Sequence, residues 1–556
     1  MRLARTAELR GRLSGVMAAV AMVATTVMVV GVGPASAATS YVPISGQGST
    51  WSENALDQWI SDVQQYGMRI NYDGDGSTQG RQAYIAGTTD FAASDIPFQT
   101  NPDDGSAPEN PTPNSYAYMP ITAGGTVFMY NLTIDGQRVT NLRLSGQNIA
   151  KIFTGQITNW DNSAIAADNP ALSLPNEPIV PVVRSDGAGS SFEFSEWMIS
   201  QYPSVWNAFC NATGRAPTCG PTSFWPTTPT IPMIAQAGDL GVAGYVAQNY
   251  AAGSIGYVEY SYALNAHFPV VNMLNAAGYY TEPTPQNVAV SLLQAQINMD
   301  SSNPAVYLTE NLSNVYTDPD PRTYPLSSYS YLILPTTVQG QFTDDKGKTL
   351  AAFSYYAMCQ GQQDSASLGY SPMPINLVEA SFAQIAKIPG ADVQNINIQS
   401  CNNPTFTSTG QNLLAEDAPQ PPACDEQGPT QCTAGTGGAA TVSTPVSGSK
   451  KAGVTLSGPT KAATAPTNGS TAGSTTTTTT APTTVGPSTA GTAPESQREQ
   501  ALERILNTPS FPANVTLSSA RGWTLNQLLI GLVSAAVLAV IVVPGLVSRR
   551  MRRRRR

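Results

Sequence analysis

Histidine is almost missing from this chain, which has a single one, His267, among 556 residues. A zinc cluster with histidine ligands is therefore disfavoured, and a Ser-His-Asp triad would have to use His267, which no serine-elbow motif accompanies. C-x-x-C pairs are absent as well, so the six cysteines do not form a zinc-ligand pattern. These shortages argue against a metalloenzyme or a serine hydrolase and leave His267 as a surface or loop residue.

Basic residues are scarce away from the two ends of the chain. The sequence has 28 lysines and arginines against 37 aspartates and glutamates. Seven arginines lie in the C-terminal tail, and four arginines and one glutamate lie near the N-terminus, which leaves 17 basic and 36 acidic residues between them, a net charge of −19. Such a surface argues against nucleic acid as a partner. A small anion would have to be held by short-range hydrogen bonds and local dipoles.

Long apolar runs occur only near the two ends. Four arginines precede the run from Val16 to Val32, and Ala35-Ser36-Ala37 follows it, which predicts a signal peptide over residues 1–37. No cysteine follows that run, so a lipid anchor is not expected there. The second run, Leu525 to Val547, predicts a transmembrane helix, and the basic residues 548–556 are expected to stay cytoplasmic. The chain is thus expected to be a single-pass protein of the cell membrane with its bulk outside.

A stretch rich in Thr, Ser, Pro, Gly and Ala, residues 433–494, separates the body from this anchor and includes six consecutive threonines, Thr475 to Thr480. It cannot build a core and predicts a disordered linker. As a flexible tether of about 62 residues it would have an end-to-end distance on the order of 45 Å. Residues 495–524 form a juxtamembrane segment in this scheme, and residues 38–432 form the extracellular domain.

The six cysteines of an exported chain favour disulfides. Cys210 with Cys219 is the simplest local pairing. The other four cysteines could attach the C-terminal segment, including the proline-rich run from Pro419 to Pro422, to the body. The sequence leaves the connectivity of these four open, and they are Cys359, Cys401, Cys424 and Cys432.

Three segments rich in glycine and hydroxyl residues each run into an amphipathic, helix-like stretch: Gly46–Trp51, Asp75–Gly80 and Arg184–Ser191. A helix start leaves N–H groups unpaired and carries a partial positive charge, while glycine lets an anion approach the backbone. Taken singly, each segment is explained better as a loop with a helix cap, and Thr50-x-x-Glu53 and Ser190-x-x-Glu193 are capping-box patterns. Taken together, the three could surround one small tetrahedral oxyanion.

Arg184 and Asp95 make such an anion site more specific. Arginine can donate a planar pair of hydrogen bonds to phosphate oxygens, whereas a carboxylate repels an anion unless that anion has a proton to donate. Phosphate has that proton near neutral pH and sulfate does not. Asp95 would therefore select against sulfate.

These segments resemble the periplasmic phosphate-binding proteins of the phosphate-specific ABC transporter, the PstS family. The similarity covers about residues 45–393 and is strongest from Leu144 to Phe194. It includes Ile152-Phe153-Thr154-Gly155-Gln156-Ile157-Thr158-Asn159-Trp160, Gly256-Tyr257-Val258-Glu259-Tyr260 and Tyr324-Pro325-Leu326-Ser327. The resemblance implies a substrate-binding protein that is no enzyme, needs no cofactor or metal and hands phosphate to an ABC permease.

The resemblance also implies the ligand contacts, which are Ser49, Thr50, Trp51, Ser77, Asp95, Arg184, Ala188, Gly189 and Ser190. Asp95 would accept the phosphate proton and Arg184 would supply the cation. The family usually has Gly-Ser-Gly-Thr where this chain has Gly187-Ala188-Gly189-Ser190. Ala188 keeps its backbone N–H but lacks a hydroxyl, which should weaken binding by about 1 kcal/mol.

For the fold, apolar strands such as Thr126–Tyr130, Ile179–Val183 and Tyr331–Leu334 alternate with helical stretches and predict an α/β protein. The resemblance implies the two-lobed class II periplasmic-binding-protein fold. Lobe I would span about 41–120 and 278–400, and lobe II about 121–277, with hinge crossovers near 119–125 and 272–283. A membrane-anchored phosphate sensor or a surface adhesion protein on the same fold stays open as the alternative function.

Overall fold

The computed structural model describes residues 40–113, 115–398, 401–405 and 411–444. The predicted signal peptide, most of the linker, the juxtamembrane segment, the transmembrane helix and the basic tail lie outside these residues. Within the described ranges, none of the helices combines the length and the apolar character that crossing a membrane requires.

An eight-stranded sheet forms the centre of the fold, with the strand order β2-β1-β3-β15-β4-β10-β8-β9. β1 is parallel to β2 and β3, β8 is parallel to β9 and β10, and β4 is antiparallel to β15 and β10. In sheet order the strands are β2 (Ile70–Asp73), β1 (Ile44–Gly48), β3 (Phe91–Ser94), β15 (Ser327–Pro335), β4 (Tyr116–Tyr130), β10 (Ser254–Glu259), β8 (Val180–Arg184) and β9 (Ile234–Gln236).

The long strand β4 joins the two halves of this sheet. Its residues 116–125 pair with β15 and its residues 126–130 pair with β10. All of its residues are buried. The first lobe is therefore built on β1, β2, β3 and β15, the second on β8, β9 and β10, and the first expected crossover lies within β4. The predicted strands Thr126–Tyr130 and Tyr331–Leu334 are confirmed as parts of β4 and β15, and the predicted strand Ile179–Val183 is confirmed as β8, which begins one residue later.

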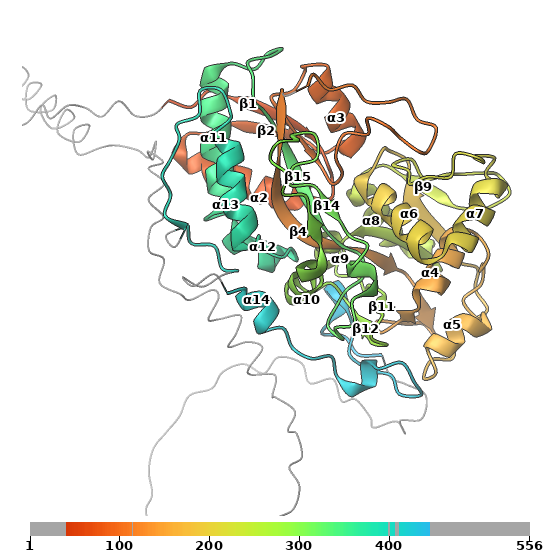
Figure 1. The fold of residues 1–556 in the computed structure, drawn as a ribbon. Helices are drawn as coiled ribbons and strands as arrows, with labels where there is room; N and C mark the ends of the chain where they lie inside the picture. The colour runs from red at the N-terminus through yellow and green to blue at the C-terminus, as the bar shows by residue number, and fades with distance from the viewer. Residues whose placement is uncertain (1–39, 114, 399–400, 406–410, 445–556) are drawn as a thin grey trace, which may run out of the picture. The chain divides into compact units, whose positions relative to one another are not determined.

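Helices cover both lobes (Figure 1). Those of the first lobe are α2 (Glu53–Val63), α3 (Ser77–Ile85), α10 (Pro285–Ser291), α11 (Asp344–Met358), α12 (Gln362–Leu368), α13 (Ile375–Ile385) and α14 (Leu413–Glu416). Those of the second are α4 (Gly146–Phe153), α5 (Ser163–Asp168), α6 (Gly189–Gln201), α7 (Pro203–Ala212), α8 (Gly238–Val246) and α9 (Tyr260–Asn265). α11 begins where the Thr343 side chain accepts a hydrogen bond from the N–H of Lys346, with Asp344 and Asp345 in the favourable first turn.

Three small sheets contain the other strands of the described residues: β7 (Arg143–Leu144) with β11 (Asn272–Leu274) and β12 (Tyr280–Thr281), β13 (Gln296–Ile297) with β14 (Glu310–Asn311), and β5 (Thr133–Ile134) with β6 (Gln137–Arg138). A separate small unit of residues 40–43 and 62–69 contains the turn η1 (Gln64–Tyr66), which ends as the N–H of Gly67 donates to the Gln64 carbonyl. The larger unit contains the central sheet.

Aromatic rings fill the core of the second lobe. Phe194 on α6 packs against Phe128, Phe153, Trp225 and Tyr257, with ring centroids 5.1 to 5.4 Å apart. All these rings are nearly or fully buried. This packing fixes α6 against the sheet and thereby fixes the position of the α6 N-terminus.

The start of α6 differs from the predicted capping box at Ser190. The helix begins at Gly189, its N-cap is Ala188, and the cap makes no side-chain hydrogen bond. The Ser190 hydroxyl lies within the first turn and accepts from Arg184 Nη1 at 3.5 Å. The capping-box prediction is wrong here because the helix begins two residues earlier than an N-cap at Ser190 requires, and the Ser190 hydroxyl bonds Arg184 instead.

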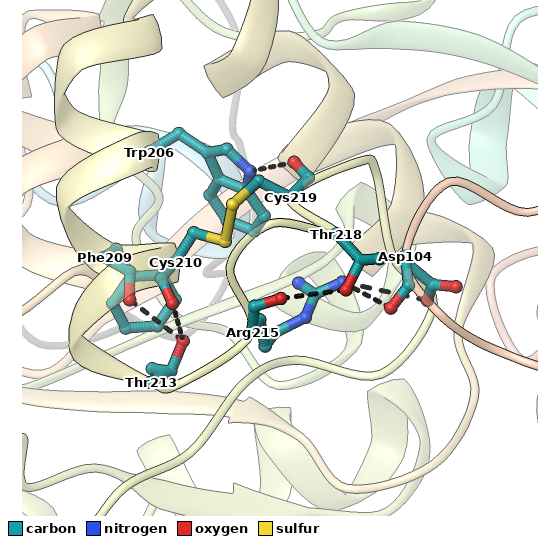
Figure 2. Close-up of a disulfide and its surroundings, with 8 residues drawn as sticks. All are labelled: Asp104, Trp206, Phe209, Cys210, Thr213, Arg215, Thr218 and Cys219. Atoms are coloured by element: carbon teal, nitrogen blue, oxygen red, sulfur yellow. Dashed lines mark hydrogen bonds and ion pairs between the residues drawn. A yellow bond between two sulfur atoms is a disulfide. The ribbon is translucent and has the colours of Figure 1, made fainter.

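Three disulfides are present. Cys210–Cys219 confirms the predicted local pair, and Figure 2 shows it bridging α7 and the loop that carries Arg215 and Thr218. Cys359–Cys401 ties the C-terminal segment to the end of α11, whereas Cys424–Cys432 closes a small loop within that segment.

The packed domain extends further along the chain than expected, because the linker does not begin at Thr433. Thr436 is buried and donates to the Val270 carbonyl, and Thr444 Oγ1 accepts from the N–H of Thr140 at 2.8 Å. Ala439 is also buried. The small and hydroxyl-bearing residues that suggested a linker instead fit closely against the second lobe as far as Thr444.

Candidate functional site

The three glycine-rich segments come together because each follows a strand of the central sheet. β1 ends at Gly48 beside Ala93 of β3, and β8 ends at Arg184. Gly48 has a φ of 138°, and a Cβ there would lie 2.1 Å from the Ala93 carbonyl oxygen, so only glycine fits. The carboxyl ends of parallel strands thus position Ser49 and Asp95 next to one another.

Asp95 is surrounded by hydroxyl groups. Ser49 and Ser330 donate to its Oδ1 at 2.5 and 2.9 Å, and Ser77 donates to its Oδ2 at 2.9 Å. Burial raises the pKa of Asp95 above its usual value, the three hydroxyl hydrogen bonds lower it, and the charge of Asp239 adds to the increase. Asp95 is therefore an ordered, fully enclosed hydrogen-bond acceptor.

Arg184 provides the cation. Its Nη2 donates to Thr50 Oγ1 at 2.9 Å, its Nη1 to Asp239 Oδ2 at 2.5 Å and its Nε to Asp186 Oδ1 at 2.8 Å. Burial alone would lower the pKa of Arg184, but the charge of Asp239 and the hydrogen bond to Asp186 hold it above the usual value. Burial would raise the pKa of Asp186, and the arginine outweighs that effect and lowers it. The guanidinium is thus held rigidly between two carboxylates.

The sequence patterns missed two of these residues and gave a third no role. Asp239 is the second residue of α8, just after β9, and a glycine–aspartate pair at a helix start gave no distinctive signal. Ser330 lies within a buried strand, where only the nearby family-like segment ending at Ser327 could have drawn attention to it. Asp186 stands inside the third glycine-rich segment, and its pairing with Arg184 depends on the turn between β8 and α6.

The two lobes meet directly at this site. The N–H of Thr78 at the start of α3 donates to the Gly187 carbonyl at 2.9 Å. Thr50 Oγ1 of the first lobe donates to Asp239 Oδ2 of the second at 2.5 Å. A Cβ on Gly189 would lie 2.5 Å from Asp95 Oδ2. The structure therefore has the lobes closed on one another, with the predicted site residues between them.

Trp51 and Ala188 are placed at the edges of the site. The Trp51 indole Nε1 donates to Thr126 Oγ1 at 3.2 Å, and its carbonyl accepts from the Tyr370 hydroxyl at 2.7 Å. The N–H of Ala188 donates to the Ser223 carbonyl at 3.0 Å. The expectation that this N–H stays available for a ligand is therefore corrected, because the chain already uses it.

A second interlobe contact lies beside the site. The N–H of Gly220 donates to the Asp103 carbonyl at 3.0 Å, and Arg215 Nη2 lies 3.9 Å from Asp104 Oδ2. Figure 2 shows Arg215 reaching Asp104 from the loop that the Cys210–Cys219 disulfide closes. A cavity of 290 Å³ lies next to this contact, with Arg81 and Glu109 of the first lobe and Phe192 and Phe224 of the second among its lining residues. We call the pairing of Asp103 and Asp104 with residues 215–220 the loop contact.

Comparison with known proteins identifies the family. Residues 33–360 match the model of the "PBP superfamily domain". The phosphate-binding protein PstS of Xylella fastidiosa is 31% identical over 350 residues, which are 62% of this chain and 85% of that protein. The chain belongs to the PstS family. PstS of Haemophilus influenzae is 29% identical over 344 residues, 61% of this chain and 92% of that protein.

Among solved structures, the periplasmic phosphate-binding protein PfluDING, determined with phosphate bound, is 19% identical, covers 65% of this chain and 99% of its own, and gives a TM-score of 0.47. PstS proteins are substrate-binding transport proteins and not enzymes, and their binding domain works outside the cytoplasm. The two-lobed α/β architecture described above is that of the superfamily.

Proposed function

We propose that this protein captures inorganic phosphate between its two lobes and delivers it to an ABC importer without carrying out a chemical step. The observation that carries the proposal is the pairing of one acceptor and one cation across the closed cleft. Asp95 of the first lobe and Arg184 of the second both lie between the glycine-rich segments and are almost fully buried.

Each site residue has a role in this proposal. The hydroxyls of Ser49, Thr50 and Ser77 and the backbone N–H groups of Thr50 and Trp51 would donate from the first lobe. Gly189 and Ser190 open α6 and present N–H groups that lack partners within the helix, so they would donate from the second lobe. Ala188 would line the cleft through its methyl group, while Arg184 supplies the charge.

Asp95 would make the site bind phosphate in preference to sulfate. Three hydroxyls bond its oxygens in this structure, and each of these hydroxyls can rotate to donate to a bound anion instead. Asp95 would then accept a hydrogen bond from the ligand, which requires a protonated oxyanion. Sulfate has no such proton and would leave two negative groups in contact.

Isothermal titration of the full chain, purified in detergent and stripped of phosphate, tests the proposal. We expect tight phosphate binding and no measurable response to sulfate. Asp95→Asn replaces the acceptor by an amide that can donate, so it should weaken phosphate binding by about tenfold or more and admit sulfate. A wild-type protein that binds neither ion would overturn the proposal, and unchanged selectivity in the variant would remove Asp95 from this role.

We also propose the finer organisation that the sequence indicates for residues outside the described ranges. The signal peptide at residues 1–37 would direct export, and the helix at 525–547 would anchor the chain as a single-pass protein with residues 548–556 inside. The linker would begin after the packed segment that ends at Thr444. Retention in the membrane pellet after alkaline extraction supports the anchor, and release into the supernatant contradicts it.

A further inference from the structure

Asp239 lies in the cleft, although the proposed binding of phosphate does not require a carboxylate at this position. It is fully buried in the first turn of α8. Its Oδ2 accepts from Arg184 Nη1 and from Thr50 Oγ1, both at 2.5 Å, and its Oδ1 accepts from the N–H of Glu259 at 2.8 Å. One carboxylate therefore accepts hydrogen bonds from a donor of each lobe, Thr50 of the first and Arg184 of the second.

Arg184 already has another partner. Asp186 accepts from its Nε at 2.8 Å and bonds its Nη2 as well. The buried group of Arg184, Asp186 and Asp239 consequently has one positive and two negative charges, so an incoming anion meets a net negative group rather than a free cation.

We propose that Asp239 is an affinity-determining residue that competes with the bound anion for Arg184 Nη1 and Thr50 Oγ1. This inference rests on the proposed function, which assigns the same two donors to phosphate. Asp239 weakens phosphate binding and speeds release, because its charge repels the ligand and its oxygen holds donors that the ligand needs. A receptor that must hand its ligand to an importer benefits from such a limit on affinity.

Asp239→Asn tests the inference in the full chain. The variant removes the charge and keeps an acceptor oxygen for the N–H of Glu259, while Asp186 still holds the guanidinium. We expect phosphate to bind on the order of tenfold more tightly by titration and to dissociate more slowly in stopped-flow fluorescence. If Asp239 had only a structural role, the variant should bind phosphate more weakly, because its cleft would be disturbed.

Asp168→Asn is the matched control. Asp168 is a buried carboxylate of the same lobe that accepts from the N–H of Ser145 at 2.7 Å and from the Tyr280 hydroxyl at 2.9 Å, and it makes no contact with Arg184. The affinity of the Asp168→Asn variant for phosphate should equal that of the wild type. Asp239→Ser provides a second charge-removing variant in case Asp239→Asn does not melt like the native protein.

The outcomes separate the two proposals. Tighter binding in either folded Asp239 variant, with the control unchanged, supports the inference. Unchanged or weaker binding in the folded variants, in a background where the wild type binds phosphate, overturns it and leaves the proposed function standing. A wild type that binds no phosphate overturns the proposed function and this inference with it.

Discussion

Gly189 shows how closely the lobes approach at the level of a single residue. A Cβ at this position would lie 2.5 Å from Asp95 Oδ2 and 2.6 Å from Asp95 Cβ. The backbone of Gly189 belongs to α6, which any residue can adopt. Glycine is therefore needed here for the close approach of the lobes and not for its backbone conformation.

Gly189→Ala should weaken phosphate binding by about tenfold or more, because overpacking typically costs about 1–3 kcal/mol. The added methyl group pushes against Asp95 only when the cleft is closed, so the open protein should fold normally. Isothermal titration measures the affinity, and a thermal melt verifies the fold.

Gly244→Ala on α8 is the control for this substitution, since a Cβ there would meet nothing within 4 Å. It should leave phosphate affinity unchanged and raise stability by about 0.5–1 kcal/mol. Equal affinities for Gly189→Ala and the wild type would show that the closed arrangement is not the one that binds.

The nine predicted site residues lie in or beside one cleft, but their partners could not be predicted. Local patterns of glycine and hydroxyl residues marked the segments because helix starts have local signals. The hydrogen bonds from Ser330 to Asp95 and from Thr50 to Asp239 join residues 235 and 189 positions apart. Such pairings depend on which strands become neighbours, and neither residue type nor spacing reveals them.

At the scale of elements, the loop contact is a second connection between the lobes that depends on a disulfide. The Cys210–Cys219 bond closes the turn that carries Arg215 and presents the N–H of Gly220 to Asp103. Trp206 Nε1 donates to the Cys219 carbonyl at 2.7 Å and so fixes the turn against α7 (Figure 2). The disulfide should therefore influence cleft closure as well as stability.

Replacing Cys210 and Cys219 together by serine should lower the free energy of unfolding by about 2–3 kcal/mol, the loop-closure contribution expected for so short a loop. It should also weaken phosphate binding, because a mobile turn no longer holds Asp103 and Asp104. Chemical denaturation and titration measure the two effects separately.

Cys424→Ser with Cys432→Ser is the matched control, because that disulfide closes a loop of nearly equal length, with a sequence separation of 8 rather than 9. It should cost similar stability and leave the phosphate affinity unchanged. The same loss of affinity in both double variants would attribute the effect to general destabilisation rather than to the loop contact.

For the whole molecule, the sequence patterns predicted alternating strands and helices, and the resemblance supplied the two-lobed topology. The strand patterns could not show that residues 116–130 form one strand shared by both lobes, because a continuous apolar run gives no sign of where its partner changes from β15 to β10. The docking of residues 433–444 was missed because small polar residues suit both linkers and close backbone packing.

Buried carboxyl groups should make the stability of the whole protein depend on pH. Burial raises the pKa of Glu53 to about 7 from 4.5, although a hydrogen bond from the Tyr262 hydroxyl opposes the increase. Burial also raises the pKa of Glu193, Glu259 and Glu310. The folded state thus binds more protons than the unfolded state, so this contribution to stability is complete below about pH 4.5 and is lost as the pH rises through about 7.

The melting temperature of the phosphate-free protein should consequently fall between about pH 5 and pH 8, and Glu53→Gln should flatten part of that slope because glutamine does not titrate. Glu379→Gln, a change at an exposed position of α13, should leave the slope as it is. Differential scanning calorimetry across this pH range measures the melting temperature of the wild type and of both variants. A slope that Glu53→Gln leaves unchanged would mean that Glu53 is already ionised across this pH range in the folded state. In that case its carboxylate helps to hold Tyr262, whose hydroxyl also donates to the Thr50 carbonyl at the edge of the cleft.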